Sequence, residues 1–207
     1  MKNIAYIWGL ALLLTGPAFA QKDKKAQTIL DAMSQKYKAL NAYKAAFSYT
    51  GAESYKGDLT VKNEHFRLAM GDQEVFSDGK TMSTYIKETN ELNVQEQEKG
   101  ASELNPTQIY NLYKRGFDYK YVKEQKQGGR TVEVIQLTPN KKKINVASVL
   151  LSIDKADKSI RNWLITDKNG KKSTYTITSF TPNVNVPDTY FVFDKAKHPG
   201  VEVVDLR

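Results

Sequence analysis

The sequence predicts a mainly β protein with helices (α+β), built as one unclosed, strongly curved antiparallel half-barrel. Apolar residues recur at every second position through most of the chain, as strands with one buried face require. Turn-forming residues separate these runs, and only two segments of the chain after the leader have a helical period. Two helices are too few to cover both faces of so large a sheet. We therefore expect an N-terminal helix and a short inserted helix to plug its concave face.

The first twenty residues have the pattern of a cleaved signal peptide. Lys2 supplies a positive start, residues 4–14 are apolar, and Ala18-Phe19-Ala20 places small residues at a cleavage site before Gln21. The apolar run is shorter than the ~20 residues that a membrane-spanning helix needs. An uncleaved anchor is the alternative. We expect residues 21–207 to reach the periplasm as one domain and to be monomeric.

Composition limits the chemistry of the exported chain. It has no cysteine, which excludes disulfides and thiol catalysis and removes the usual ligands of structural zinc. The formal net charge is +8, and removing Lys2 leaves +7. On an exported protein this charge indicates solubility, an anionic lipid or an acidic partner, and we expect no nucleic-acid binding.

The clearest helix follows the leader. Ile29, Met33, Tyr37 and Leu40 recur at spacings of four, four and three, which predicts an amphipathic helix over residues 26–42.

After this helix the apolar period changes to two. The predicted strands contain, in order, Phe47 and Tyr49, Leu59 and Val61, Phe66 to Met70, Met82 to Ile86, Leu92 to Gln95, Tyr119 to Lys126, Val132 to Leu137, Val149 to Ile153, Ile160 to Thr166, Tyr175 and Ile177, and finally Phe191 and Phe193 with Val201 and Val203. Ser77-Asp78-Gly79-Lys80 is interpreted as a β-turn, because it lacks the further glycines of a phosphate loop. Asn169-Gly170 is the strongest hairpin signal.

A short helix is predicted over residues 103–115, between two strands. Asn105 is suited to its N-cap and Pro106 to its first position. Ile109, Leu112 and Tyr113 fall on one side, and Gly116 is a plausible stop.

No residue pattern in the chain indicates catalysis, a metal site or a cofactor. The two histidines, His65 and His198, lack a partner motif, and the chain contains no HExxH, GxSxG or dinucleotide signature. An enzyme is therefore the weakest interpretation.

A curved sheet with so little helix has more inner apolar face than its helices can fill, which favours a ligand cavity. If the strands alternate regularly, the cavity and its lid contain Leu59, Val61, Phe66, Leu68, Met82, Ile109, Leu112, Tyr113, Val149, Leu151, Trp163, Tyr175 and Ile177. As core residues alone, the same side chains would need no ligand.

Several segments, in order and with matching spacing, resemble one known family. They are Gly57 to Lys62 with Phe66, Ser77 to Met82 with Tyr85, Gln136 to Pro139, Phe191 to Phe193 and Gly200 to Asp205. Together they resemble the periplasmic outer-membrane lipoprotein carriers, the LolA family, over essentially the whole mature chain.

The resemblance implies an unclosed β-barrel with a helical lid over a hydrophobic cavity that shelters lipoprotein acyl chains. It also implies two partners: an inner-membrane ABC-type release complex that loads the carrier, and an outer-membrane acceptor that unloads it. The family often has an arginine directly after the lysine at Lys62, and this arginine hydrogen-bonds the closed lid. Here Asn63 and Glu64 occupy that loop.

Two other functions fit the same fold. One is an envelope-stress sensor of lipids or mislocalised lipoproteins, a class that usually carries a second domain, which we do not expect here. The other is a carrier of a different apolar molecule, such as a pigment or a glycolipid intermediate. Lys141 to Lys143 form a basic loop that is either solvated or docks on a membrane or an acidic surface.

Overall fold

We describe the protein from a computed structural model, which describes residues 23–97, 107, 109–114, 116–141 and 145–207. The helices are α1 (Lys24–Lys38) and the short 3-10 helices η1 (Ile109–Lys114), η2 (Asp188–Phe191) and η3 (Lys195–Lys197). The strands are β1 (Ala42–Thr50), β2 (Ser54–Lys62), β3 (His65–Met70), β4 (Gln73–Ser77), β5 (Thr81–Ile86), β6 (Glu91–Glu96), β7 (Phe117–Gln127), β8 (Arg130–Pro139), β9 (Val146–Asp154), β10 (Ile160–Asp167), β11 (Lys172–Pro182) and β12 (Glu202–Asp205).

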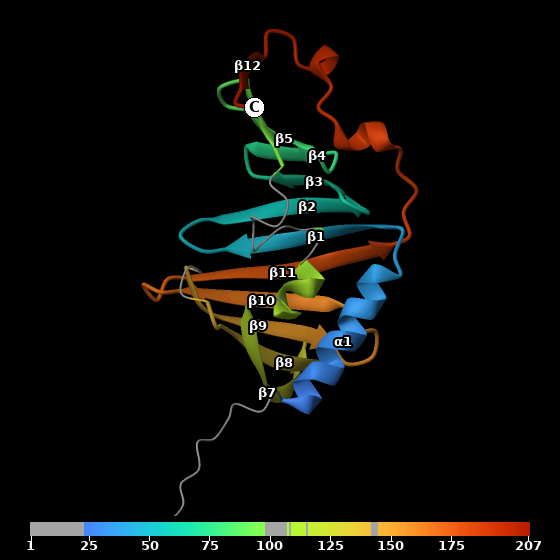
Figure 1. Ribbon diagram of the computed structural model, residues 1–207, viewed down its shortest axis with the longest axis vertical. Coiled ribbons are helices and arrows are strands. Elements are labelled where there is room, and N and C mark those ends of the chain that lie inside the picture. Colours follow the sequence, from blue (N-terminus) through green and yellow to red (C-terminus); the bar gives the residue numbers. More distant parts are fainter. Residues whose placement is uncertain (1–22, 98–106, 108, 115, 142–144) are drawn as a thin grey trace, which may run out of the picture.

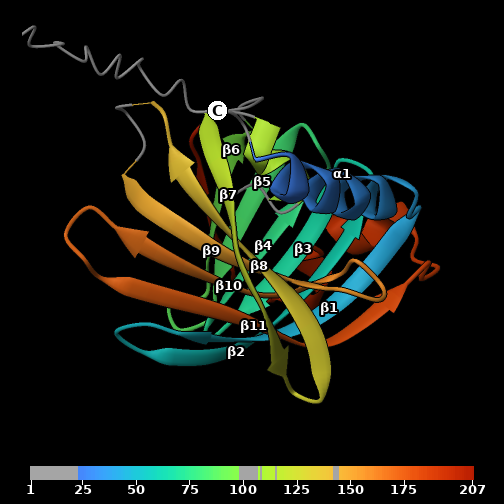
Figure 2. The same ribbon diagram turned by 90° about the horizontal axis from the view of Figure 1, so that it is seen from below.

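All the strands belong to one 12-stranded sheet, in the order β12-β6-β5-β4-β3-β2-β1-β11-β10-β9-β8-β7. Most neighbours in the sheet are also neighbours in the chain, and β1 joins the two halves because it pairs with both β2 and β11. The sheet curves strongly, and its edge strands β7 and β12 do not pair with each other (Figures 1 and 2). The predicted mainly β, unclosed architecture is confirmed.

Helix α1 lies across the concave side of the sheet (Figure 2). It begins at Asp23, whose side chain accepts a hydrogen bond from the backbone N–H of Ala26 (3.0 Å). The same carboxylate also accepts the backbone N–H of Tyr121 on the edge strand β7 (2.8 Å), and so fastens the start of the helix to the sheet. Leu30 and Met33 are buried on the face that contacts the strands.

The helix ends four residues before the predicted residue 42. Ala39 is the C-cap, and Ala42 already pairs with Lys62 as the first residue of β1. Alanine favours a helix, but strand β1, which begins at Ala42, pairs on both sides with strands that contain β-branched and aromatic residues. Pairing within the sheet therefore decides this boundary.

The C-terminal segment differs most from prediction. Phe191 ends η2 and Phe193 lies in a loop, so neither belongs to a strand. Of the predicted C-terminal strand residues, only those around Val203 form a strand, β12. It pairs with β6 in parallel rather than antiparallel. The chain reaches this edge after crossing over β3 to β5, and it therefore arrives in the direction of β6 (Figure 1).

That crossing segment creates a second core on the convex face of the sheet. Phe193 packs on Phe76, Tyr85 and Leu92 of β4, β5 and β6, and His198 stacks on its ring with centroids 4.5 Å apart. The sequence analysis placed all apolar packing on the concave side and missed this cluster. The C-terminal segment therefore covers the convex face of β4 to β6.

The turns follow the sequence closely. At Ser77 to Lys80, the Asp78 carboxylate accepts the backbone N–H groups of Lys80 (2.9 Å) and Thr81 (2.7 Å), as a β-turn requires. Gly170 closes the β10–β11 hairpin with φ +82°, a conformation that favours glycine.

Candidate functional site

Side chains on the concave face continue from strand to strand because the strands pair in register. In one half of the sheet, Tyr43 lies opposite Val61, which lies opposite Phe66. In the other half, Trp163 lies opposite Leu151. Each such row runs across the concave face of the sheet, which we call the trough. The apolar surface of the trough is therefore continuous from strand to strand.

The predicted lining residues divide into buried and partly exposed ones. Val61, Phe66, Tyr113, Val149 and Leu151 are buried, whereas Leu59, Leu68, Met82, Trp163, Tyr175 and Ile177 are partly exposed. The register places the strand residues among them on one face. The buried ones pack under α1 and its neighbours, and the partly exposed ones leave apolar surface inside the trough. Whether any of them contacts a ligand stays a prediction.

The structure describes only part of the inserted segment, which was predicted as a short helix over residues 103–115. Its described part is the 3-10 helix η1 instead of the predicted α-helix, while residues 103–106, 108 and 115 lie outside the described residues. The side chains of Ile109 and Leu112 also lie outside them. Tyr113 is buried, and its hydroxyl donates a hydrogen bond to the Asp31 carboxylate on α1.

A second polar contact joins the same two helices, because the Ser34 hydroxyl donates to the side-chain oxygen of Asn111 (2.9 Å). Burial and the neighbouring Asp31 carboxylate raise the pKa of Tyr113, so its phenol stays a proton donor. Helix η1 is thus attached to α1 by two polar contacts, and Tyr113 also packs edge-on against Tyr119 of β7, with ring centroids 6.0 Å apart.

Aromatic side chains gather where α1 ends, and the sequence analysis did not include most of them. Tyr37 stacks on Tyr110 of η1 with ring centroids 5.8 Å apart, and it meets Tyr43 and Phe180 edge-on at 5.5 and 5.7 Å. The period of two that Phe47 and Tyr49 establish in β1, extended back along the strand, places Tyr43 on the same face. Phe180 was hidden by a register shift between β1 and β11, which places Phe180 and Ile177 on one face despite their odd spacing.

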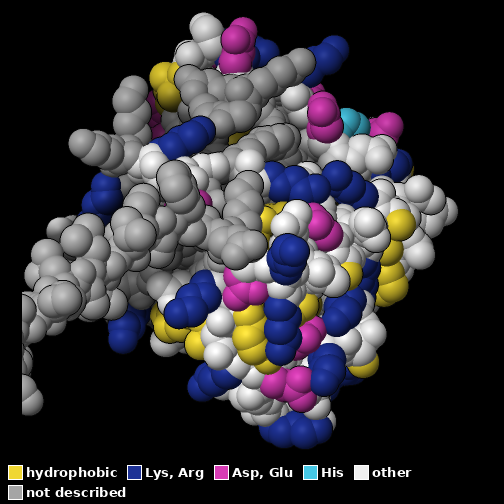
Figure 3. Space-filling model, turned by 60° about the horizontal axis from the view of Figure 1, so that its bottom comes forward, with side chains coloured by type: hydrophobic (Ala, Val, Ile, Leu, Met, Phe, Trp, Pro, Cys, Tyr) yellow, Lys and Arg dark blue, Asp and Glu magenta, His cyan; other side chains and the backbone are white. Residues whose placement is uncertain are grey.

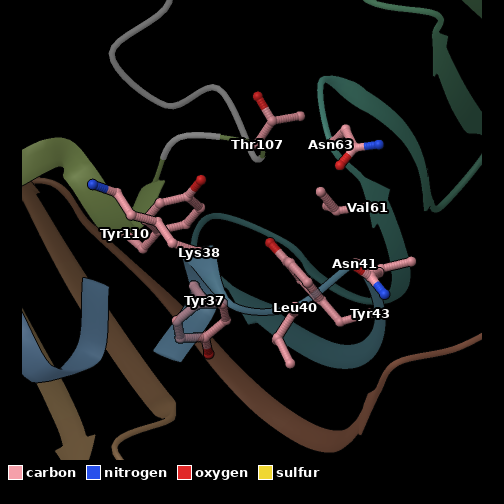
Figure 4. Close-up of a pocket in the computed structure, with 10 residues that line it drawn as sticks. Tyr37, Lys38, Leu40, Asn41, Tyr43, Val61, Asn63, Thr107 and Tyr110 are labelled. Atoms are coloured by element: carbon pink, nitrogen blue, oxygen red, sulfur yellow. The ribbon is translucent and has the colours of Figure 1, made fainter. Parts of the chain in front are cut away.

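A pocket of about 80 Å³ opens beside this cluster (Figure 4). The residues that line it include Lys38 at the end of α1, Leu40 just after it, Val61 of β2, Asn63 of the β2–β3 turn and Tyr110 of η1. Ligand pockets for drug-sized molecules usually measure at least about 300 Å³. This pocket alone is too small for an acyl chain.

Asn63 forms the rim of the pocket in a left-handed backbone conformation, with φ +54°. Asparagine tolerates this conformation better than most residues, whereas arginine does not favour it. The two-residue turn therefore explains why asparagine stands where the family resemblance suggested an arginine.

Burial also raises the pKa values of the tyrosine hydroxyls in this aromatic cluster. Loss of hydration raises the pKa of Tyr37 to about 12, although the backbone N–H of Ile160, which the hydroxyl accepts, opposes this rise. Burial raises the pKa of Tyr43 as well. Both groups stay neutral at physiological pH, so the inner face presents no negative charge to a ligand here.

Among the described residues, no group of three or more metal-binding side chains gathers. His65 lies 3.9 Å from Asp188, and the His198 ring packs at a tilt against Tyr85, with ring centroids 4.5 Å apart. Both histidines lie in the convex-side packing. None of the helices described is both long and apolar enough to cross a membrane.

A trough with a partly exposed apolar face and a helix across it is the geometry that the family resemblance implied. The family model of the outer membrane lipoprotein carrier protein LolA matches residues 16–171 of the 207. The chain belongs to the LolA family. Membership supports a carrier-type role for lipids or lipoproteins, in a family of carriers and binders rather than enzymes.

Several solved structures are similar to this LolA family member at low sequence identity. An uncharacterized conserved protein from Thermus thermophilus gives a TM-score of 0.63 at 16% identity, over 86% of this chain and 98% of that one. LprF from Mycobacterium bovis gives 0.50 at 14% identity, over 80% and 97%. A chain of the Pseudomonas aeruginosa MucA/MucB complex gives 0.48 at 15% identity, over 83% and 62%. A comparison with curated proteins finds no match.

Proposed function

We propose that this protein is a periplasmic carrier that holds the acyl chains of a lipoprotein against the concave face of its sheet and delivers the lipoprotein from the inner to the outer membrane. The observation that carries the proposal is the partial exposure of Leu59, Leu68, Met82 and Trp163 on a face that α1 only partly covers. Soluble proteins seldom leave a continuous apolar surface of this kind without a ligand or a partner.

The energetics favour a lid that competes with the ligand. Burying a 16-carbon acyl chain at about 0.8 kcal/mol per methylene yields on the order of 12 kcal/mol, which would make release very slow. A carrier therefore needs an empty state that covers the same surface and recovers part of this energy. Helix η1, attached to α1 by Tyr113 and Asn111, is the element suited to that role.

A charged side chain in the trough tests whether this surface holds acyl chains. Leu68→Glu places a carboxylate on the partly exposed concave surface, and Val192→Glu is the matched control on a side chain that is 53% exposed. We expect Leu68→Glu to lower the affinity for a fluorescent fatty acid at least tenfold, with the control unchanged. Circular dichroism and urea unfolding check that both variants fold. Unchanged affinity in folded Leu68→Glu would refute acyl binding at this surface.

The cargo and the direction of transfer need a separate experiment. The partners that the family resemblance implies are an inner-membrane ABC-type release complex and an outer-membrane acceptor. Mass spectrometry of the protein purified from its own periplasm should identify a co-purifying lipoprotein, and the protein should release lipoproteins from spheroplasts. Leu112→Glu in the predicted lid should reduce that release more than it reduces stability. A co-purifying pigment or glycolipid, without lipoprotein release, would instead support a carrier of another molecule.

A further inference from the structure

The concave face carries a row of aromatic rings near the β1–β2 and β10–β11 hairpins, at the end away from α1 in Figure 1. Trp163, Tyr175, Tyr49 and Tyr55 are successive cross-strand partners on β10, β11, β1 and β2. Their ring centroids are 5.1, 5.0 and 6.1 Å apart along the row. Tyr55 ends this aromatic row with 36% of its surface exposed.

Lysines surround this end of the sheet. Lys171 and Lys172 lie at the β10–β11 hairpin, and Lys141 lies in the β8–β9 connection, two strands away at the same end. All three are exposed, and none of them forms an ion pair with a residue that the structure describes. We call these three residues the basic rim.

Several carboxylates lie at this end of the molecule. Asp72 lies exposed in the β3–β4 turn, and Asp118, beside Lys141, accepts a hydrogen bond from the Asn140 side chain (3.2 Å). Asp167 accepts the backbone N–H groups of Asn169 (2.9 Å) and Lys171 (2.8 Å), so it serves the hairpin turn. Glu53 lies exposed at the tip of the β1–β2 hairpin. Elsewhere, on the face shown in Figure 3, lysine and arginine side chains are interspersed with acidic ones, as on a solvated surface. The basic rim differs because it stands beside half-exposed tyrosine and tryptophan rings.

We propose that this end of the half-barrel docks on the surface of an anionic lipid bilayer. Tyrosine and tryptophan are the side chains enriched at the membrane–water interface, where the ring is shielded and its polar group stays wet. Each lysine near an anionic leaflet adds about fivefold to binding affinity. Docking there would place the uncovered end of the trough against the lipid.

Trp163 allows a direct test. The sequence has only two tryptophans, Trp8 and Trp163, so a chain that begins at Gln21 carries a single reporter in the aromatic row. This chain includes every residue that the structure describes. We expect vesicles of phosphatidylglycerol with brominated acyl chains to quench Trp163 fluorescence at low salt, and vesicles of phosphatidylcholine to leave it unchanged. Raising the salt concentration to 0.5 M should abolish the quenching, because it screens the lysines.

Two charge-reversal variants then locate the contact. Lys141→Glu with Lys171→Glu and Lys172→Glu should weaken co-sedimentation with phosphatidylglycerol vesicles about a hundredfold. The matched control makes the same charge change at three exposed lysines elsewhere, Lys24, Lys44 and Lys80, and should weaken it less than fivefold.

The outcomes separate the alternatives. Equal weakening by the two variants would overturn the proposal, since it would show attraction by net charge alone. Absence of binding to phosphatidylglycerol vesicles would also overturn it, and would leave an acidic protein surface as the partner of the basic rim. Vesicle binding needs no bound cargo, so its failure is distinguishable from failure of the carrier function, which the Leu68→Glu experiment measures.

Discussion

The hydroxyl of Tyr37 on α1 accepts a hydrogen bond from the backbone N–H of Ile160 at the start of β10, at 3.1 Å. The two residues are 123 positions apart in the chain, and both are buried. Nearby, the Lys36 ammonium donates to the backbone carbonyl of Asp157 (2.6 Å), so the end of α1 is attached to the β9–β10 turn at two points. Movement of α1 away from the sheet must break both contacts.

Replacing Tyr37 with phenylalanine should destabilise the protein by about 1–3 kcal/mol, because it leaves the buried N–H of Ile160 without its acceptor. Urea unfolding measures this loss. Tyr49→Phe is the matched control, since its hydroxyl pairs with Ser173 at a partly exposed site (3.2 Å) and should cost less than about 1 kcal/mol. Equal losses in the two variants would contradict a special role for the Tyr37 contact.

Tyr113→Phe should loosen η1 with little effect on global stability. It removes the hydrogen bond to Asp31, whose carboxylate is partly exposed and can be hydrated instead. Hydrogen exchange at residues 109–114 should become faster, while the urea midpoint changes little. Tyr85→Phe removes a comparable bond to Asn90 on the convex side (3.0 Å) and should leave exchange in η1 unchanged. Unaltered exchange in Tyr113→Phe would show that this bond does not hold η1.

Asp154 should make stability depend on acid pH. Burial alone would raise the pKa of this carboxyl, but the backbone N–H groups of Ala156 and Asp157, together with Arg130 and Arg161, hold it below its ordinary value. A lowered pKa in the folded state stabilises the fold above the unfolded value of about 3.9, and this contribution disappears as the pH falls through the folded value.

Asp154→Asn should therefore lower the free energy of unfolding at pH 7 by about 1–3 kcal/mol. The difference from wild type should narrow as the pH falls below about 4, because the carboxyl of the unfolded chain is then protonated while the folded state still holds it ionised. Urea unfolding at a series of pH values from 7 to 3 gives both curves. A constant difference over that range would mean that the charge of Asp154 is not what stabilises the fold.

Gly57→Ala should disturb the trough from within the sheet. A Cβ atom at this position would lie 2.4 Å from the Phe47 ring and 2.8 Å from the carbonyl oxygen of Ala69. Phe47 must move, and we expect a loss of about 1–3 kcal/mol. Ser54→Ala, at an exposed position of the same strand, should change the free energy of unfolding by less than about 0.5 kcal/mol. Thermal unfolding measures both variants. Wild-type stability of Gly57→Ala would show that Phe47 can give way freely.

Local patterns in the sequence were sufficient for most of the strands and turns, although they missed β4 and wrongly placed Phe191 and Phe193 in a strand. The alternation of Val149, Leu151 and Ile153 predicts the strand β9 with one buried face, and Asn169-Gly170 predicts the β10–β11 hairpin, because both depend on backbone geometry within a few residues. The same alternation placed Leu59, Val61 and Trp163 on a common face, as the register has them. Their contact with a ligand is still a prediction.

The tertiary structure alone decided which strands meet and what covers each face. Tyr49 lies next to Ser173, 124 residues away, because β1 closes the gap between two meanders. Phe193 packs on the convex face and Val203 pairs in parallel with Leu92 because the C-terminal segment crosses the sheet before it pairs. Contacts between residues so far apart in the chain depend on the packing of the whole molecule. Packing balances the apolar area that is buried against the entropy lost on closing long loops, and no local sequence pattern encodes that balance.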